Sequence, residues 1–348
     1  MKKLPFFASF IVTVAVLSCA STAPTPTPPA QQAEGSTAFD ETLPEELRAA
    51  MARAAEARKR AVDFESPSYF PSDWEAAEAQ YAQAGQVSSA YDAAADAYDS
   101  LFKLAIPLYA QAREDEIMAL RNNLVAAGAR NYFPEPFSHA DRTALTALDQ
   151  YEADDYYAAR DTAAQALKMY QILTTAYDAW LVQHEIEERE FISYDPDNFE
   201  RAGEILSNAI DAYGAGDYAS AQNNADEAQL RYNLVLSTGW AAYAALRSSM
   251  AEAERQAALD IKANIAVKDL FSEADTTYKT GEDAFTSKEY PEAARQFINS
   301  EALFIMASAS ASEKRHTAVE IMREANRKIE ESDETARQAE IILEGGAE

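Results

Sequence analysis

The chain has 348 residues, of which 58 are acidic and 30 are basic, so its formal net charge is −28. The acidic residues are spread through every segment and no basic stripe interrupts them, which argues against nucleic acid and anionic lipid surfaces as partners. The length is sufficient for two ordinary domains or for one extended array.

The N-terminus has the pattern of an exported, lipidated protein. Lys2 and Lys3 precede an apolar run at residues 4–17, which is shorter than the ~20 residues that span a bilayer as a helix. Cys19, the only cysteine, follows closely, and the pattern resembles a bacterial lipobox, in which the thiol is acylated and the preceding peptide is removed. We predict a signal peptide over residues 1–18 and a lipid anchor, such as palmitate, on Cys19. The alternative is an ordinary secretory signal.

Residues 19–40 are predicted to be a flexible tether. Proline alternates with threonine from Pro24 to Pro29, which disfavours helix and favours an extended chain. At ~3.1 Å per residue this tether could hold a folded part up to ~50–60 Å from a lipid surface. The predicted location is the cell envelope, at the outer membrane or at the periplasmic face of a membrane.

Residues 41–343 are predicted to form an all-α repeat domain. Ala, Glu, Tyr and Leu dominate, Gly and Pro are rare inside long stretches, and no strand-like alternation is sustained. An aromatic residue opens each of four short predicted helices at spacings of 63, 62 and 72, namely Trp74, Phe137, Phe199 and Phe271. Residues 344–348 are predicted to be a disordered tail.

The repeat spacing predicts long helices joined by short ones. A short helix over residues 197–213 separates long helices over 155–192 and 217–264. We expect each unit to be a three-helix bundle made from the end of one long helix, the short helix and the start of the next. The stretches 43–63 and 313–343 would complete the terminal bundles, giving an elongated array of about four units, an α-solenoid or rod.

Parts of the repeat resemble the tetratricopeptide repeat. Ala209 and Gly281 match its small residue in the first helix, Tyr218 and Tyr290 match its turn tyrosine, and small residues follow in the second helix. More broadly, residues ~60–310 resemble the alanine-rich helical domains of bacterial envelope lipoproteins, especially spirochaetal lipoproteins with tetratricopeptide-like repeats. The resemblance implies an envelope scaffold or a partner of a periplasmic solute-binding system, and it brings no catalytic residue.

The chain shows no motif for catalysis or metal binding. His139, His184 and His316 lie far apart, and none has a second His or Cys at metal-ligand spacing. The segment that begins with Asp195 and Pro196 resembles the start of a calcium-binding loop. We favour a different interpretation, in which Asp195 caps a helix and Pro196 occupies its first turn. The prediction is a protein without enzymatic activity, metal or cofactor.

The candidate partner surface is the aromatic face of the short helices, consisting of Tyr151, Tyr213, Tyr278 and Phe285. Residues 7 and 14 positions after the opening aromatic share one helix face. This face is either bundle core or part of an aromatic groove for a peptide or helix.

The sequence therefore predicts a lipid-anchored scaffold or adaptor that binds another envelope protein or a peptide. One alternative is a periplasmic module that takes a small apolar ligand for a transporter. The other is a passive envelope spacer.

Overall fold

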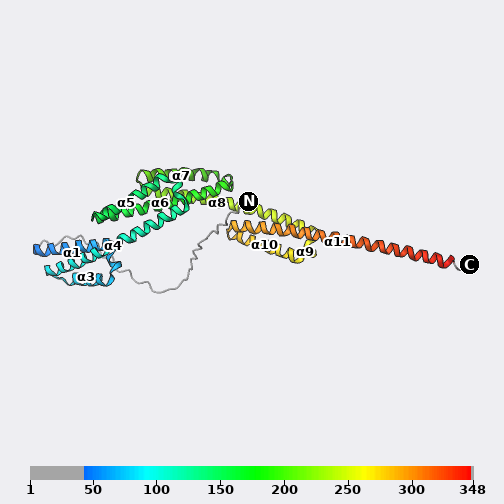
Figure 1. Ribbon diagram of the computed structural model, residues 1–348, viewed down its shortest axis with the longest axis horizontal. Coiled ribbons are helices and arrows are strands. Elements are labelled where there is room, and N and C mark those ends of the chain that lie inside the picture. The colour runs from blue at the N-terminus through cyan, green and yellow to red at the C-terminus, as the bar shows by residue number, and fades with distance from the viewer. Residues whose placement is uncertain (1–42, 346–348) are drawn as a thin grey trace. The chain divides into compact units, whose positions relative to one another are not determined.

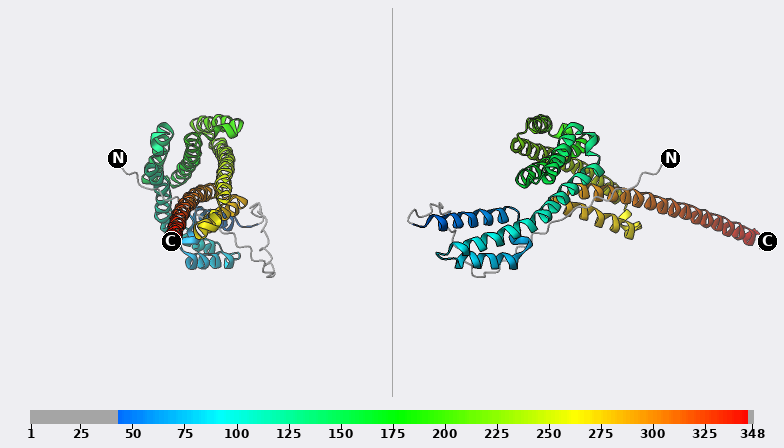
Figure 2. Two further views of the ribbon diagram at one scale, coloured as in Figure 1. Left: turned by 90° about the vertical axis from the view of Figure 1, so that its right-hand side faces the viewer. Right: turned by 60° about the vertical axis from the view of Figure 1, so that its left-hand side comes forward.

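The computed structural model describes residues 43–345, which are helical throughout apart from short turns (Figures 1 and 2). No strand occurs within this range, so the all-α prediction is confirmed. The helices are α1 (Glu45–Asp63), α2 (Ser66–Tyr69), α3 (Pro71–Gln83), α4 (Ser88–Ala127), α5 (Pro134–Glu152), α6 (Tyr156–Glu188), α7 (Pro196–Gly214), α8 (Tyr218–Asp260), α9 (Ala263–Ala266), α10 (Lys268–Thr286) and α11 (Tyr290–Gly345). Two 3₁₀ turns, η1 (Ala129–Asn131) and η2 (Phe191–Tyr194), precede α5 and α7.

The chain divides into two compact units. The described part of the first comprises residues 43–62 and 70–101, and that of the second comprises 63–69 and 102–345. In the first unit α1, α3 and the start of α4 pack as a bundle, with the Trp74 and Tyr98 ring centroids 5.1 Å apart.

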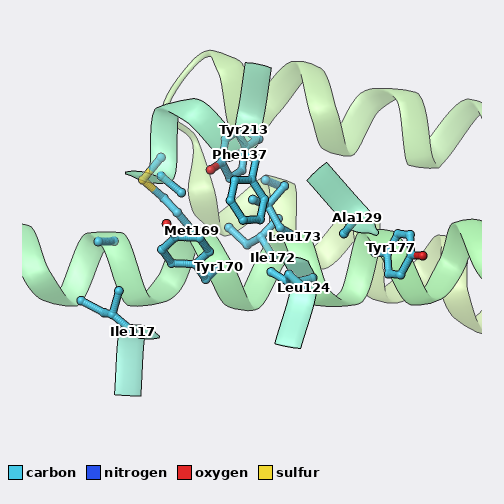
Figure 3. Close-up of a cluster of buried hydrophobic side chains, with 13 residues drawn as sticks. Ile117, Leu124, Ala129, Phe137, Met169, Tyr170, Ile172, Leu173, Tyr177 and Tyr213 are labelled. Carbon is cyan, nitrogen blue, oxygen red and sulfur yellow. The ribbon is translucent and has the colours of Figure 1, made fainter. Parts of the chain in front are cut away.

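The second unit contains three successive three-helix bundles, as the repeat spacing predicted. The end of α4, the short α5 and the start of α6 share one core, in which Leu124, Phe137 and Leu173 are buried (Figure 3). The end of α6, α7 and the start of α8 share the next core, and the end of α8, α10 and the start of α11 share the last. The long helices α6 and α8 therefore each serve two bundles.

The corners of the bundles follow local rules of helix capping. Asp155, Asp195 and Asp217 precede α6, α7 and α8, and the carboxylate of each accepts a hydrogen bond from a first-turn backbone N–H. Pro196 occupies the first turn of α7, where its missing N–H costs nothing. The capping interpretation of Asp195 and Pro196 is thus confirmed.

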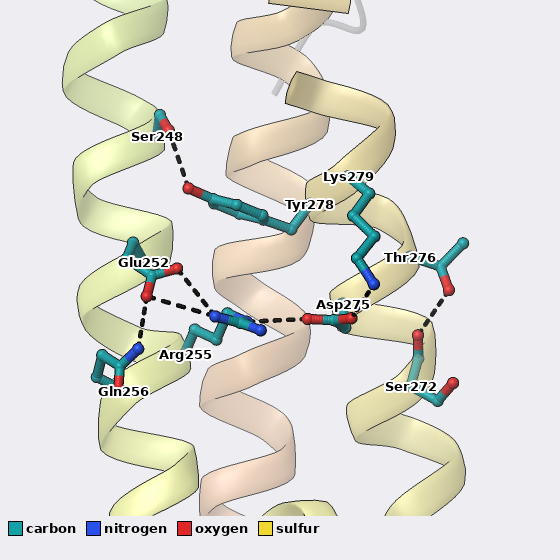
Figure 4. A network of polar contacts seen from close by, with 9 residues as sticks. All are labelled: Ser248, Glu252, Arg255, Gln256, Ser272, Asp275, Thr276, Tyr278 and Lys279. Carbon is teal, nitrogen blue, oxygen red and sulfur yellow. Dashed lines mark hydrogen bonds and ion pairs between the residues drawn. The ribbon is translucent and has the colours of Figure 1, made fainter. Parts of the chain in front are cut away.

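A polar clamp recurs in three bundles. Each clamp joins an arginine near the end of a long helix to an acidic residue on the short helix, 20 positions later, in the pairs Arg58–Glu78, Arg121–Asp141 and Arg255–Asp275. The Nε–carboxylate distances are 2.6, 2.7 and 2.9 Å. Figure 4 shows the last clamp, in which Asp275 also accepts from Lys279 at 2.8 Å. The clamps fix each short helix to the long helix before it.

A buried tyrosine completes two of the clamps. Tyr98 donates to Glu78 at 2.7 Å, and Tyr170 donates to Asp141. The α7 bundle lacks a clamp, because Gln183 and Gly203 stand where the others have the arginine and the acid.

Tyr232 occupies the tyrosine position of the α7 bundle without a polar partner. It is fully buried, and its hydroxyl makes no hydrogen bond. A Cβ added to Gly203 would lie 3.4 Å from that hydroxyl, so a side chain at this position would be next to it.

The C-terminal prediction is wrong. Residues 313–343 do not complete a terminal bundle, because α11 is continuous to Gly345 and every side chain from 312 to 339 is exposed. No Gly or Pro interrupts the sequence between Pro291 and Gly345, so nothing ends the helix and reverses the chain. The helix also includes residues 344 and 345 of the predicted tail, whereas 346–348 lie outside the described residues.

Candidate functional site

An open cavity of about 580 Å³ lies between the second half of α4, α5 and the first half of α6. Every residue that lines it belongs to the second unit. We call this cavity the α4–α5–α6 groove. Its apolar and aromatic lining comprises Phe64, Ile106, Pro107, Tyr109, Ala110, Ile117, Met118, Ala144, Leu145, Ala147, Leu148, Tyr151, Tyr156, Ala159, Ala163 and Tyr170, and its other lining residues are Gln111, Arg113, Glu114, Arg121, Asp141 and Arg160.

The walls of the groove carry large aliphatic side chains that remain exposed. Leu145 and Leu148 are one helical turn apart on α5, and Met118 lies on α4. Single exposed apolar residues are common on protein surfaces, but several around one concave site mark a place where something binds. These three side chains are the groove's exposed apolar wall.

The floor of the groove is the clamp of Arg121, Asp141 and Tyr170. Arg121 donates through Nε to Asp141 Oδ1 at 2.7 Å and through a second nitrogen to Oδ2 at 3.3 Å. Burial disfavours the charged carboxylate, but hydrogen bonds from Arg121 and Tyr170 outweigh it and lower the pKa of Asp141. Burial and then the bond to Asp141 raise the pKa of Tyr170, so its hydroxyl stays a donor. The floor is rigid and its polar groups are satisfied.

The arginines of the lining are paired with carboxylates. Arg121 pairs with Asp141, Arg113 with Glu116 at 2.9 Å, and Arg160 with Asp161 at 2.7 Å. These three side chains therefore add little net positive charge to the groove.

Arg113 has unused hydrogen-bonding capacity. Its guanidinium stacks over the Tyr109 ring at 5.3 Å and pairs with Glu116 at 2.9 Å, yet its Nε is buried and makes no hydrogen bond. That nitrogen has no exposed surface, so a ligand in the groove would reach it only if the Arg113 side chain moved.

The structure separates the four aromatic residues that the sequence grouped as a partner surface. Tyr151 alone among them lines the groove. Tyr278 packs against Phe297 and shares a hydrogen bond of 3.2 Å with Ser248 (Figure 4), and Phe285 packs against Tyr290. Both are partly buried and pack against the α8–α10–α11 core.

Tyr213 is a correction to the predicted surface. Only 1% of it is exposed, so it cannot contact a partner (Figure 3). Its hydroxyl donates to the Pro136 carbonyl at 2.9 Å, because the α7–α8 corner packs on the start of α5. The core alternative is therefore right for Tyr213. Cys19, the predicted lipidation site, lies outside the described residues.

Two features of the groove lining were missed in the sequence. The clamp had a readable signal, namely an arginine 16 residues before the opening aromatic and an acid 4 residues after it, as in Arg121, Phe137 and Asp141. Leu148 lies on the aromatic stripe itself, 11 positions after Phe137, and Leu145 lies beside the stripe, so both were overlooked because only the aromatic residues of that face were considered.

The histidines are not brought together. His139 lies against Tyr213, His184 stacks on Trp180, and His316 lies 3.7 Å from Glu320. Among the described residues no group of three or more His, Cys, Asp or Glu side chains is placed to hold a metal ion. No helix in the described part of the chain is long and apolar enough to cross a membrane.

Comparison with known proteins gives one distant relative. The chain is 24% identical over 227 residues to Treponemal membrane protein A of Treponema phagedenis. The match covers 65% of this chain and 66% of the relative, just under two thirds of its length. No protein-family model matches the chain. No solved structure matches it either.

Proposed function

We propose that this chain is a non-enzymatic, lipid-anchored adaptor of a spirochaetal cell envelope, and that it binds an amphipathic helix or peptide of another envelope protein in the α4–α5–α6 groove. The envelope location is supported by the distant relationship to a spirochaete membrane protein and by the lipobox-like sequence at Cys19. The adaptor role rests on one observation, the exposed apolar wall of Leu145, Leu148 and Met118 around an open cavity.

The chemistry of the groove selects the kind of partner. A helix that carries apolar residues at i, i+3, i+4 and i+7 presents a stripe that fits between two helical walls. The arginines of the lining are already paired with carboxylates, so the apolar stripe of the partner, and not its charge, is what the groove selects.

The exposed wall sets the scale of the interaction. Fully burying a leucine or methionine contributes about 1.5–3 kcal/mol, and about half of each of the three side chains is still exposed. Covering them contributes about 3 kcal/mol in total, which corresponds to roughly a hundredfold in Kd. Loss of the wall should therefore be easy to measure.

A small apolar ligand is the second candidate for the same groove. The observation that favours it is the volume of about 580 Å³, which lies within the ~300–1,000 Å³ of small-molecule sites. In that case the chain would serve as the ligand-binding part of a transport system rather than as an adaptor.

The test compares two leucine pairs with the same exposed fractions, 61% and 49%. Leu145→Ser with Leu148→Ser alters the groove, and Leu230→Ser with Leu234→Ser alters α8 outside the groove. In-cell crosslinking and mass spectrometry should recover a defined envelope protein with the parent chain and the control pair. The groove pair should lose it at an unchanged melting temperature.

Other outcomes separate the alternatives. A groove-dependent apolar molecule found by native mass spectrometry, without a protein partner, would support the ligand-binding candidate instead. If the groove pair and the control pair capture the same proteins equally well, the groove is not the binding site. The anchor is tested separately, because a Cys19→Ser chain that still fractionates with membranes would contradict lipidation at that residue.

A further inference from the structure

The last part of α11 is a long helix with no packing partner. Beyond Ala311 every side chain to residue 339 is exposed. One contact to the bundle in this part is the hydrogen bond from Lys314 Nζ to the Ala266 carbonyl, at 2.8 Å. Figures 1 and 2 both show α11 continuing past α9 and α10. An isolated helix is marginally stable in water, because most helical stability in proteins comes from packing of an apolar face.

The exposed part of α11 has the sequence of a coiled-coil seam. Small and apolar residues recur at alternating intervals of four and three, which places them on one stripe. The stripe consists of Ala318, Met322, Ala325, Ile329, Ser332, Ala336 and Ala339. Met322 and Ile329 are among the most exposed large apolar residues described in the chain. Such a stripe needs a second helix to cover it.

The order of large and small residues favours an antiparallel partner of the same sequence. In an antiparallel pair whose twofold axis passes between residues 330 and 331, Ile329 lies opposite Ser332 of the second copy. Met322 then lies opposite Ala339. Each large side chain thus meets a small one, which fills space without overlap.

A parallel pair of the same helix packs less well. In register, Ala325 would meet Ala325 of the second copy and Ile329 would meet Ile329. Over residues 322–339 the parallel pair has two layers of paired large residues and four layers of paired small ones. In the antiparallel pair only the layers of Ala325 opposite Ala336 are small on both sides, and each large residue faces a small one.

Charge points to the same orientation. In the paired segment, residues 322–328 contain three basic residues and one acidic residue, whereas residues 329–339 contain one basic residue and four acidic residues. Antiparallel helices place the basic segment of one copy beside the acidic segment of the other. Parallel helices place segments of the same charge beside each other. Paired helices lie ~8–10 Å apart, close to the ~8 Å Debye length at physiological salt, so the preference is weakened but not removed.

We infer that residues 322–339 of α11 form an antiparallel coiled coil with a second copy of this chain. The occupant is a second copy, rather than an unrelated protein, because the stripe is complementary in size and charge to its own reversed sequence. The resulting interface is isologous, so it closes as a dimer and does not extend into a filament. This inference is independent of the groove and its partner.

The first test measures association of the full chain carrying Cys19→Ser, so that acylation contributes nothing. Sedimentation equilibrium should show a monomer–dimer equilibrium that weakens as salt rises. Met322→Glu with Ile329→Glu should weaken the dimer by roughly a thousandfold or more, because four apolar side chains are replaced by charges in the seam. The matched control is Ile305→Glu with Met306→Glu, similarly exposed residues of the same types where α11 still packs in its bundle.

The second test reads the orientation. Cys19 is the only cysteine, so its removal leaves a clean background for disulfide crosslinking. Ala325→Cys and Ala336→Cys chains should crosslink when mixed and much less when each is oxidised alone. Efficient crosslinking of the Ala325→Cys chain to itself would mean a parallel pair and would overturn the inference.

Two further results would also overturn it. One is a parent chain that stays monomeric at all concentrations with its helix content intact. The other is a monomeric chain whose α11 seam instead binds phosphatidylcholine vesicles and loses that binding in the Met322→Glu, Ile329→Glu variant.

Discussion

Two buried tyrosines at the same repeat position should respond oppositely to loss of their hydroxyl. Tyr170 donates to Asp141, which Arg121 also pairs with. Tyr232 is equally buried but makes no hydrogen bond, and burial raises its pKa to about 12. The pair therefore isolates the contribution of the clamp from the contribution of a buried aromatic ring.

The expected magnitudes follow from hydrogen-bond energetics. Tyr170→Phe removes a bond to a charged group, which costs about 1.5–3 kcal/mol. Tyr232→Phe removes a buried hydroxyl that has lost its hydration without gaining a partner, so stability should be unchanged or should rise by about 1 kcal/mol. The two variants should differ by at least ~2 kcal/mol, although the ring packing is conserved in both.

Urea unfolding followed by circular dichroism measures this difference. Repeat proteins unfold in several transitions when their units are weakly coupled. The urea midpoint of each transition is therefore compared between variant and parent, with the m-value of that transition held constant. Tyr98→Phe is the second clamp variant, since Tyr98 donates to Glu78, and it should behave like Tyr170→Phe. Equal destabilisation by Tyr170→Phe and Tyr232→Phe would refute the reasoning.

Two further predictions concern packing and acid stability. Gly239→Ala should destabilise the protein by about 1–3 kcal/mol in thermal melts, because the added Cβ would lie 2.4–2.7 Å from Phe191. Gly214→Ala, with open space around the added Cβ, should stabilise it by about 0.5–1 kcal/mol. Equal effects of the two substitutions would contradict the geometry. Hydrogen bonds lower the pKa of Asp141 and of Asp275, so the stability these carboxylates contribute is present above about pH 4 and is lost as the pH falls further. Melting temperatures should therefore drop below about pH 4, and an unchanged melting temperature down to pH 2 would contradict this prediction.

The sequence predicted the helical repeat well because its signals are local. Capping aspartates such as Asp195 and the recurring aromatics such as Phe137 determine where helices begin, whatever they pack against. The α11 error had a different origin, since an amphipathic stripe shows that a helix needs a partner but not whether the partner is in the same chain.

The candidate site was less predictable for a related reason. Tyr151 and Tyr213 hold the same repeat position, yet one lines a groove and the other is core. Their difference depends on how closely the neighbouring bundle approaches, and that long-range geometry is not encoded at either position. Periodicity identifies a face, and only packing decides whether the face is covered.

The α7 bundle offers a constructive test, because the clamp it lacks can be installed. Gln183→Arg and Gly203→Asp place the arginine and the acid at the positions they occupy in the other clamps. The Cβ of the new aspartate would lie 3.4 Å from the Tyr232 hydroxyl, close enough for its carboxylate to accept that proton.

The double-mutant cycle should be strongly non-additive. Gly203→Asp alone brings a partly buried carboxylate without its cation and should give little gain or a loss of stability. Adding Gln183→Arg supplies the cation, so the coupling between the two substitutions should reach about 1–3 kcal/mol, measured at the α7-bundle transition in urea. Tyr232→Phe in the double variant should then become destabilising, as Tyr170→Phe is in the parent chain. If the two substitutions were additive and Tyr232→Phe remained neutral, the clamp would not be the transferable unit that its recurrence in three bundles indicates.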